Sequence, residues 1–175
     1  MHALVIFESM FGGTQTVAQA IASGVSAAVG EAAEVEVLEV SSAPTQVPAD
    51  VDLLILGAPT HAFGLSRPNT RDEAAKKTDE PLVSTGDGIR EWLVAASLPA
   101  GQRATAFDTR MAHPKAIVKF DHANHSIEKA LRKLGAEIVC APEKFTVVDV
   151  TGPLAEGEQA RAEAWGSTIV AAWQG

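Results

Sequence analysis

The sequence predicts an α/β fold, a three-layer, doubly wound parallel sheet of five strands. Three observations support this prediction. Short apolar runs alternate with longer stretches in which apolar residues recur at helical spacing, as in strands joined by crossover helices. The run 51–56 is nearly continuous in Val, Leu and Ile, which is typical of a central parallel strand. The 175 residues, of which 46% are hydrophobic, suit a single domain over residues 1–175.

Five apolar runs are expected to form the strands. They are 3–7, 35–38, 51–56, 104–108 and 137–140, and the run 145–148 could prolong the last of them. Each parallel return needs a right-handed crossover that covers one face of the sheet. Four stretches have helical spacing: one that contains Val17, Ile21 and Val25 and ends near Gly30, and others over 89–96, 127–134 and 165–173.

Ligands of doubly wound sheets bind beyond the carboxyl ends of the strands. Three segments follow strands at that edge: 8–14, 58–85 and 109–115. These segments are therefore where the sequence predicts a functional site.

Composition excludes several classes of partner. The net charge is −8 and the pI about 5.1, so nucleic acid and anionic membranes would be repelled, whereas a basic partner protein would be attracted. The single cysteine, Cys140, excludes an internal disulfide and a thiolate zinc cluster. No apolar run approaches the roughly 20 residues that cross a bilayer, and the N-terminus lacks a signal-peptide pattern. A cytoplasmic protein without a membrane span is expected.

The run SMFGGT, which joins the first strand to the first helix, has the composition of a phosphate-binding turn. Ser9 and Thr14 offer hydroxyls, and Gly12 and Gly13 allow a tight backbone with its amides turned inward. The amides at a helix N-terminus carry about half a positive charge, so a phosphate there needs no Lys or Arg. The alternative is that these residues only make a tight strand-to-helix turn.

This run resembles the phosphate loop of the flavodoxin family, whose usual pattern is Ser/Thr, any residue, Thr, Gly, any residue, Thr. The matching residues are Ser9, Met10, Phe11, Gly12, Gly13 and Thr14, and only Phe11 departs from the pattern. An aromatic residue at that place also occurs in quinone-reductase and flavodiiron-type relatives. The resemblance implies strand order 2-1-3-4-5 and flavin mononucleotide (FMN) as cofactor. The sequence has neither GxGxxG after a strand nor GxxxxGK[ST], the rival phosphate motifs.

The second segment, APTHAFG, resembles the Pro-Thr-aromatic-Gly loop of flavodoxin-like quinone reductases. The resemblance implies that Thr60 bonds the polar edge of the flavin and that His61 or Phe63 stacks on its ring. The cofactor-binding residues expected here are Pro59, Thr60, His61, Ala62, Phe63 and Gly64. The alternative is that Phe63 caps the core and His61 is a solvated loop residue.

The connection 65–85 is long and polar for a loop. Residues 70–73, with the sequence TRDE, have the spacing of a capping box, so a short helix through Lys77 is expected. This helix could form a lid or a partner surface, or the connection could be a surface insertion.

The third segment, FDTRMAHP at 107–114, leads from the end of the fourth predicted strand into a loop, where flavodoxins have a Gly-Asp turn and a stacking Tyr. The chain contains no Tyr. Asp108, Thr109 and Arg110 could hold the pyrimidine edge of the flavin, where Arg110 would stabilise an anionic reduced flavin. Alternatively, Asp108 and Arg110 pair with each other and tie the segment down.

The function expected from the resemblance is FMN-dependent electron transfer between redox partner proteins that present a basic docking surface. No catalytic side chain is expected, because the flavin carries the redox chemistry. His113, His122 and His125 do not have the spacing of a metal site, so none is predicted. Two alternatives stay open: an NAD(P)H-dependent FMN quinone reductase, and a flavodoxin-fold binding module that has lost FMN.

Overall fold

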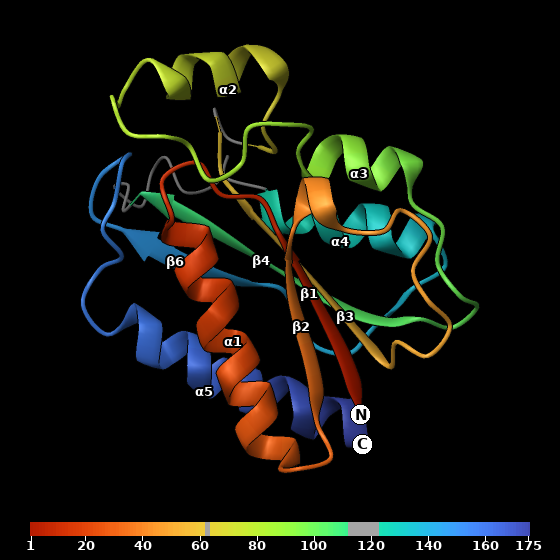
Figure 1. Cartoon of the computed structure of the whole chain (residues 1–175). Coiled ribbons are helices and arrows are strands. Elements are labelled where there is room, and N and C mark those ends of the chain that lie inside the picture. Colours follow the sequence, from red (N-terminus) through yellow and green to blue (C-terminus); the bar gives the residue numbers. More distant parts are fainter. Residues whose placement is uncertain (62–63, 112–122) are drawn as a thin grey trace.

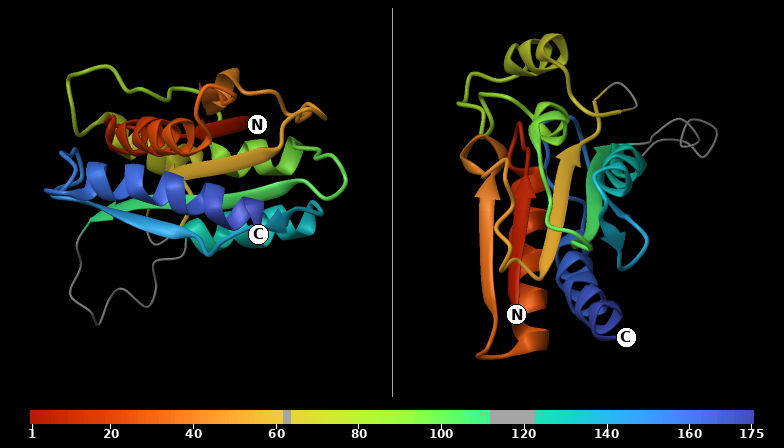
Figure 2. Two further views of the ribbon diagram at one scale, coloured as in Figure 1. Left: turned by 90° about the horizontal axis from the view of Figure 1, so that it is seen from below. Right: turned by 90° about the vertical axis from the view of Figure 1, so that its right-hand side faces the viewer.

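The computed structural model describes residues 1–61, 64–111 and 123–175, and these form a parallel sheet between two layers of helices (Figures 1 and 2). The strands are β1 (His2–Phe7), β2 (Glu34–Glu39), β3 (Leu53–Pro59), β4 (Arg103–Met111), β5 (Glu137–Ile138) and β6 (Glu143–Val147). Their order along the sheet is β2-β1-β3-β4-β5. The predicted fold class and the strand order 2-1-3-4-5 are thereby confirmed.

Helices cover both faces of the sheet (Figure 1). The helices are α1 (Gly13–Val29), α2 (Pro68–Ala75), α3 (Ile89–Ala95), α4 (Ala123–Lys133) and α5 (Glu158–Gln174), with a short 3₁₀ helix at Val40–Ser42. Alternation along the strands divides the core in two. Leu4 and Ile6 pack with α3 and α4, whereas Ala3, Val5 and Phe7 pack with α1 and α5. Among the described helices, none combines the length and apolar character that crossing a membrane requires.

The fifth position of the sheet is shared by two short strands. β5 pairs with Arg103 and Ala104, and β6 pairs with the far end of β4, from Phe107 to Met111. The expectation of one strand over 137–140, prolonged by 145–148, was therefore partly wrong. Pro142 lies between the two strands, and because proline has no N–H it cannot donate to the ladder there.

β4 is longer than predicted and ends at Met111. Thr109 and Arg110, expected on a loop, are strand residues that pair with Phe145 and Thr146 of β6. Residues 112–114 of the same predicted segment lie outside the described residues. The predicted strand ended at Asp108, and the polar residues Thr109 and Arg110 hid the rest from a prediction based on apolar runs.

The short helix in the long connection exists, but its predicted cap was wrong. α2 begins at Pro68, and Thr70 is its third residue. The Thr70 hydroxyl accepts from the backbone N–H of Arg67 at 2.9 Å and donates to the Arg67 carbonyl at 3.0 Å. Proline fits the first helical position because the N–H it lacks has no partner there.

α1 and α5 cross closely because glycines lie at the contact. A Cβ on Gly24 would overlap the carbonyl oxygen of Glu163, and a Cβ on Gly166 would overlap the carbonyl oxygen of Ile21. The backbones of α1 and α5 therefore lie closer together than any residue with a Cβ would allow at these two positions.

Replacing Gly24 with Ala is expected to lower the free energy of unfolding by about 1–3 kcal/mol, because backbone must move to make room. The loss should appear although Ala favours helix by about 1 kcal/mol over Gly. Thermal or urea unfolding measures the change. Gly86→Ala is the control, since its new Cβ would make an ordinary 3.4 Å contact with Ser41. Equal stability of the G24A variant and the wild type would contradict the tight crossing.

Candidate functional site

A cavity of about 470 Å³ lies at the carboxyl end of the sheet. Five segments line it: the β1–α1 loop, the end of β3, α2, the end of β4, and the chain from Val147 to Gly152. α2 lies over this end of the sheet (Figures 1 and 2). The volume is in the range of small-molecule and cofactor pockets.

Most of the residues predicted for the site lie together on this cavity. Those that line it are Ser9, Met10, Phe11, Gly13, Thr14, Pro59, Thr60, His61, Thr109 and Arg110. Gly12, Gly64 and Asp108 are not among the lining residues. Ala62 and Phe63 lie outside the described residues.

The structure adds lining residues that the sequence did not single out: Thr70, Glu73, Ala74, Lys77, Met111, Val147, Val150 and Gly152. Four of these residues, Thr70 to Lys77, belong to the 65–85 connection, for which a lid over the site was one of the expected roles. Met111 lies in the predicted segment 109–115, at the end of β4. Val147, Val150 and Gly152 have no local signal, because the pairing of β6 with β4 brings that part of the chain to this edge.

The β1–α1 loop has the geometry of an anion site. Gly12 has φ +87°, a left-handed conformation that suits glycine, and it is the N-cap of α1. The Gly12 N–H donates to the hydroxyl of Ser9 at 3.1 Å. No side chain caps the start of α1 within the described structure, and its first turn has no acidic residue. The partial positive charge of a 17-residue helix thus faces the cavity edge without a local anion.

Three threonines meet near this helix start. Thr14 Oγ1 and Thr109 Oγ1 share a hydrogen bond of 2.7 Å, and the Thr60 N–H donates to the Thr109 carbonyl at 2.8 Å. The hydroxyl of Thr60 is buried and has no hydrogen-bond partner among the residues described. A buried hydroxyl without a partner is costly, so its place on the cavity fits a polar ligand atom.

Asp108 and Arg110 form a buried ion pair, which is the second of the two roles considered for them. Arg110 donates from Nε to Oδ1 at 2.9 Å and from Nη2 to Oδ2 at 2.5 Å. Asp108 also accepts from the backbone N–H of Asn124 at 3.1 Å. Because the two residues are two apart on a strand, their side chains share a face. Through the bond from Asn124, the pair ties β4 to α4. Arg110 lines the cavity while it is bonded to the carboxylate of Asp108.

The family model for flavodoxin matches residues 5–165. The chain belongs to the flavodoxin family. A flavodoxin from Bacillus cereus superposes with a TM-score of 0.68 at 20% identity, covering 98% of both chains. A flavodoxin from the domain Archaea gives 0.65 at 16% identity, covering 100% of both. No curated protein has a significantly similar sequence.

Glu8 lies next to the β1–α1 loop; the sequence placed it in the segment 8–14 but gave it no role. Its side chain is fully buried, and its Oε2 accepts from the Ile89 N–H at 2.9 Å. Burial raises the pKa of Glu8, an effect that hydrogen bonds from Ser66 and Ile89 partly offset. The other oxygen, Oε1, is buried without a hydrogen-bond partner in the described part of the chain.

His61 lies on the cavity wall in a tight backbone turn. It exchanges two backbone hydrogen bonds with Gly64, at 2.8 and 3.0 Å. Burial lowers the pKa of His61, and the positive charges of Arg71 and Lys77 act in the same direction. The lowered pKa favours a neutral imidazole at the cavity, the form that suits contact with an uncharged planar ring.

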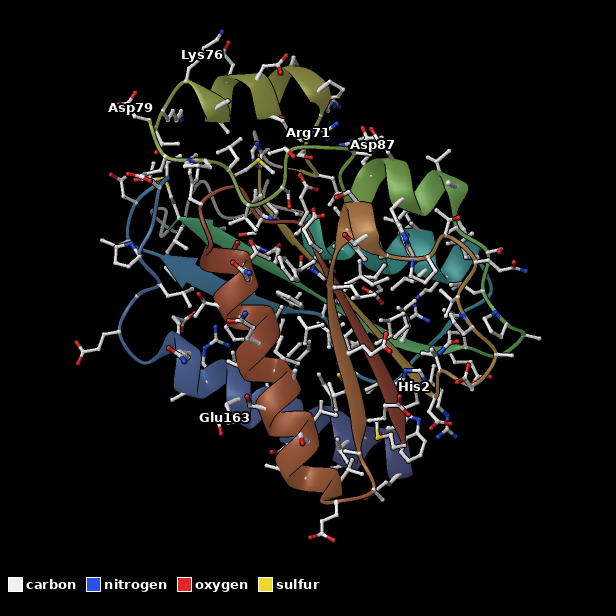
Figure 3. The ribbon with its side chains drawn as sticks, viewed as in Figure 1. His2, Arg71, Lys76, Asp79, Asp87 and Glu163 are labelled. Atoms are coloured by element: carbon white, nitrogen blue, oxygen red, sulfur yellow. The ribbon has the colours of Figure 1, made fainter. Side chains whose placement is uncertain are left out.

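α2 is fastened to the neighbouring helix through Arg71. Its Nη1 donates to the Ser66 hydroxyl at 2.9 Å and to Glu91 Oε2 at 3.1 Å. The same oxygen of Glu91 accepts from the Gly88 N–H at 2.9 Å. Figure 3 shows Arg71 below α2 and Lys76 on its outer side. α2 is therefore a fixed wall of the cavity in this structure.

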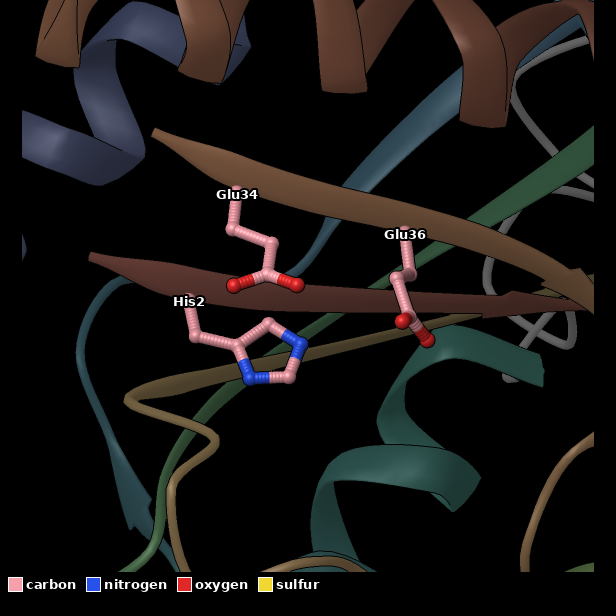
Figure 4. Close-up of side chains that lie close together, drawn as sticks. All are labelled: His2, Glu34 and Glu36. Carbon is pink, nitrogen blue, oxygen red and sulfur yellow. The ribbon is translucent and has the colours of Figure 1, made fainter. Parts of the chain in front are cut away.

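A cluster of His2, Glu34 and Glu36 could hold a metal ion, because their ligand atoms lie within 4.8 Å of one another (Figure 4). It lies at the end of the molecule opposite α2 (Figure 3). Both glutamates are exposed on the edge strand β2, where charged side chains also serve to prevent edge-to-edge pairing of sheets. The cluster is therefore explained without a metal.

Replacing Glu8 with Gln should change how stability depends on pH. A carboxyl with a raised pKa binds its proton more tightly in the folded than in the unfolded chain. Its contribution to the free energy of unfolding is therefore greatest below pH 4.5, the ordinary pKa of a glutamic acid, and falls as the pH rises through the pKa of the folded chain. Gln keeps an acceptor for the Ile89 N–H and does not titrate.

Urea unfolding of both proteins across this pH range measures the effect. The stability of the wild type minus that of the E8Q variant should fall with rising pH, by about 1.4 kcal/mol for each pH unit by which the pKa is raised. A difference that stays constant with pH would show that Glu8 titrates normally.

Proposed function

We propose that this protein binds FMN noncovalently and carries electrons, one or two at a time, between a reductase and an acceptor. The observation that carries the proposal is the uncapped start of α1, which follows a left-handed Gly12 and adjoins a cavity of about 470 Å³. Family membership supports the choice of a flavin as ligand.

The residues present fit the parts of FMN. Amides of the 9–14 loop, with the hydroxyls of Ser9 and Thr14, would hold the phosphate. Thr60, whose hydroxyl lacks a partner among the described residues, would bond a polar edge of the flavin, and His61 would contact the ring. Thr109 and Arg110 would complete the wall. The flavin supplies the redox chemistry, and the protein supplies binding, orientation and electrostatics.

The same proposal covers the setting in which the protein acts. Residues 1–175 would work as one domain in the cytoplasm, exchanging electrons with partner proteins. The net charge of −8 would favour partners with a basic docking surface.

α2 favours a second candidate, an NAD(P)H-dependent FMN quinone reductase. Four of its residues or close neighbours, Thr70, Glu73, Ala74 and Lys77, line the cavity. A wall of this kind could shape a pocket for a small acceptor beside the flavin.

Mixing the purified protein with FMN should quench the flavin fluorescence and yield a yellow complex. Adding NADH and a quinone then separates the two redox candidates: turnover no faster than that of free FMN supports the electron carrier, and faster turnover supports the reductase. A colourless protein that leaves the fluorescence of added FMN unchanged would contradict both and favour a binding module without flavin.

Replacing Gly12 with Val should weaken FMN binding about 10- to 100-fold while the fold survives. A β-branched residue is strained at φ +87°, by about 1–3 kcal/mol, and relief of that strain reshapes the loop. Calorimetric titration with FMN measures the loss. Gly157→Val is a matched control, because Gly157 is the N-cap of α5, has φ +80° and ψ −14° against +87° and −14° at Gly12, has equally open surroundings and does not line the cavity. Unchanged affinity in the G12V variant would place the phosphate elsewhere.

A further inference from the structure

Residues 83 and 84 run along the phosphate loop and bond to it. The Val83 N–H donates to the Met10 carbonyl at 3.0 Å, and the Ser84 N–H donates to the Ser9 carbonyl at 2.8 Å. The Ser84 hydroxyl accepts from the Ser9 N–H at 3.0 Å. Ser84 is 1% exposed, so these bonds form away from solvent. Ser84 thus contacts both polar groups of the Ser9 backbone.

These bonds determine which way the peptide groups of the loop face. In a trans peptide the C=O of one residue and the N–H of the next point in opposite directions. Since the carbonyls of Ser9 and Met10 point to residues 83 and 84, the N–H groups of Met10 and Phe11 point away from them. Met10 and Phe11 both line the cavity. The contact therefore engages two carbonyl dipoles that would repel an anion, and it leaves two amides on the opposite side of the loop backbone, where an anion in the cavity could accept from them.

The segment that carries Ser84 is itself anchored to the end of β1. The carboxylate of Glu8 accepts from the Ile89 N–H at 2.9 Å. At Gly88 the chain passes so close that an added Cβ would overlap Glu8 Oε2 and lie 2.8 Å from Ser66 Oγ. Ser84 thus reaches the loop from backbone that is held on both sides of Gly86, by the loop itself and by Glu8.

We propose that Ser84 is a positioning residue for the phosphate of FMN. It does not touch the ligand but holds the 9–11 backbone with its amides turned toward the phosphate. This inference rests on the proposed function, because it assumes that the anion bound by the loop is the flavin phosphate. A purely structural role for Ser84 is the competing explanation, and it would affect all flavins alike.

Ser84→Ala separates the two roles when FMN is compared with riboflavin, which lacks the phosphate. The variant keeps the backbone bonds to the Ser9 and Met10 carbonyls and removes the acceptor of the Ser9 N–H, so it loosens the first peptide group of the loop, which precedes the amides of Met10 and Phe11. We expect FMN affinity to fall about tenfold, as for the loss of one buried hydrogen-bond partner. Riboflavin affinity should stay within about twofold of wild type. Fluorescence-quenching titrations give both dissociation constants.

Thr105→Val is the control, because Thr105 is fully buried, does not line the cavity, and its hydroxyl bonds the Cys140 carbonyl at 3.2 Å and not the 9–11 backbone. Its ratio of FMN to riboflavin affinity should equal that of the wild type. If the S84A variant does not fold, Ser84→Cys carries the test, since a thiol fills the same space and is a weaker acceptor. It should show a smaller loss for FMN alone.

The outcomes distinguish the two proposals. A wild-type protein that binds neither flavin refutes the proposed function, whatever Ser84 does. A wild-type protein that binds both flavins equally keeps the flavin and refutes the role of Ser84. The role of Ser84 is also refuted if the wild type prefers FMN and the folded S84A or S84C variant has the same preference.

Discussion

The left-handed turn at Gly12 is the conformation on which the candidate site depends. It lets the chain leave a strand buried between two layers and start a helix at Gly13, after a short loop that follows Phe7. The start of α1 is thereby placed at the carboxyl edge of the sheet, where β3 and β4 also end. The helix start, the Thr60 hydroxyl and the Asp108–Arg110 pair are neighbours because parallel strands deliver their carboxyl ends to one edge.

The connection between β3 and α3 supports the loop from outside. Arg71 bonds Ser66 and Glu91, Ser84 bonds the Ser9 backbone, and Glu8 bonds the Ile89 N–H. The same connection contributes α2 to the cavity wall. The connection 65–85 has the composition of a surface insertion, but it is part of the candidate site. Its bonds link the shape of the β1–α1 loop to the position of α2.

Local patterns in the sequence predicted the features that depend on local chemistry. The apolar runs, the glycines of SMFGGT and the helix stripes lie within short windows. The fold class followed from them, and the strand order followed from the resemblance that SMFGGT carries. The end of β4 was missed because Thr109 and Arg110 are polar residues that are buried where β4 pairs with β6, and a search for apolar runs does not detect such residues. The bonds of Ser84 and Glu8 join residues 75 and 81 positions apart, a distance at which spacing carries no signal.

An acidic chain that binds an anion needs an attraction that does not come from its net charge. The net charge of −8 repels a phosphate at long range, and Arg110, the cation at the carboxyl end of β4 that lines the cavity, is bonded to Asp108. Backbone dipoles act over a few ångströms, so the helix start and the inward amides can attract the phosphate where the net charge of a distant surface is screened. The same surface charge stays available to attract a basic partner. If the two roles are separated in this way, the orientation of a few peptide groups, and hence the residues that hold them, would matter more for the proposed phosphate site than the paired Arg110.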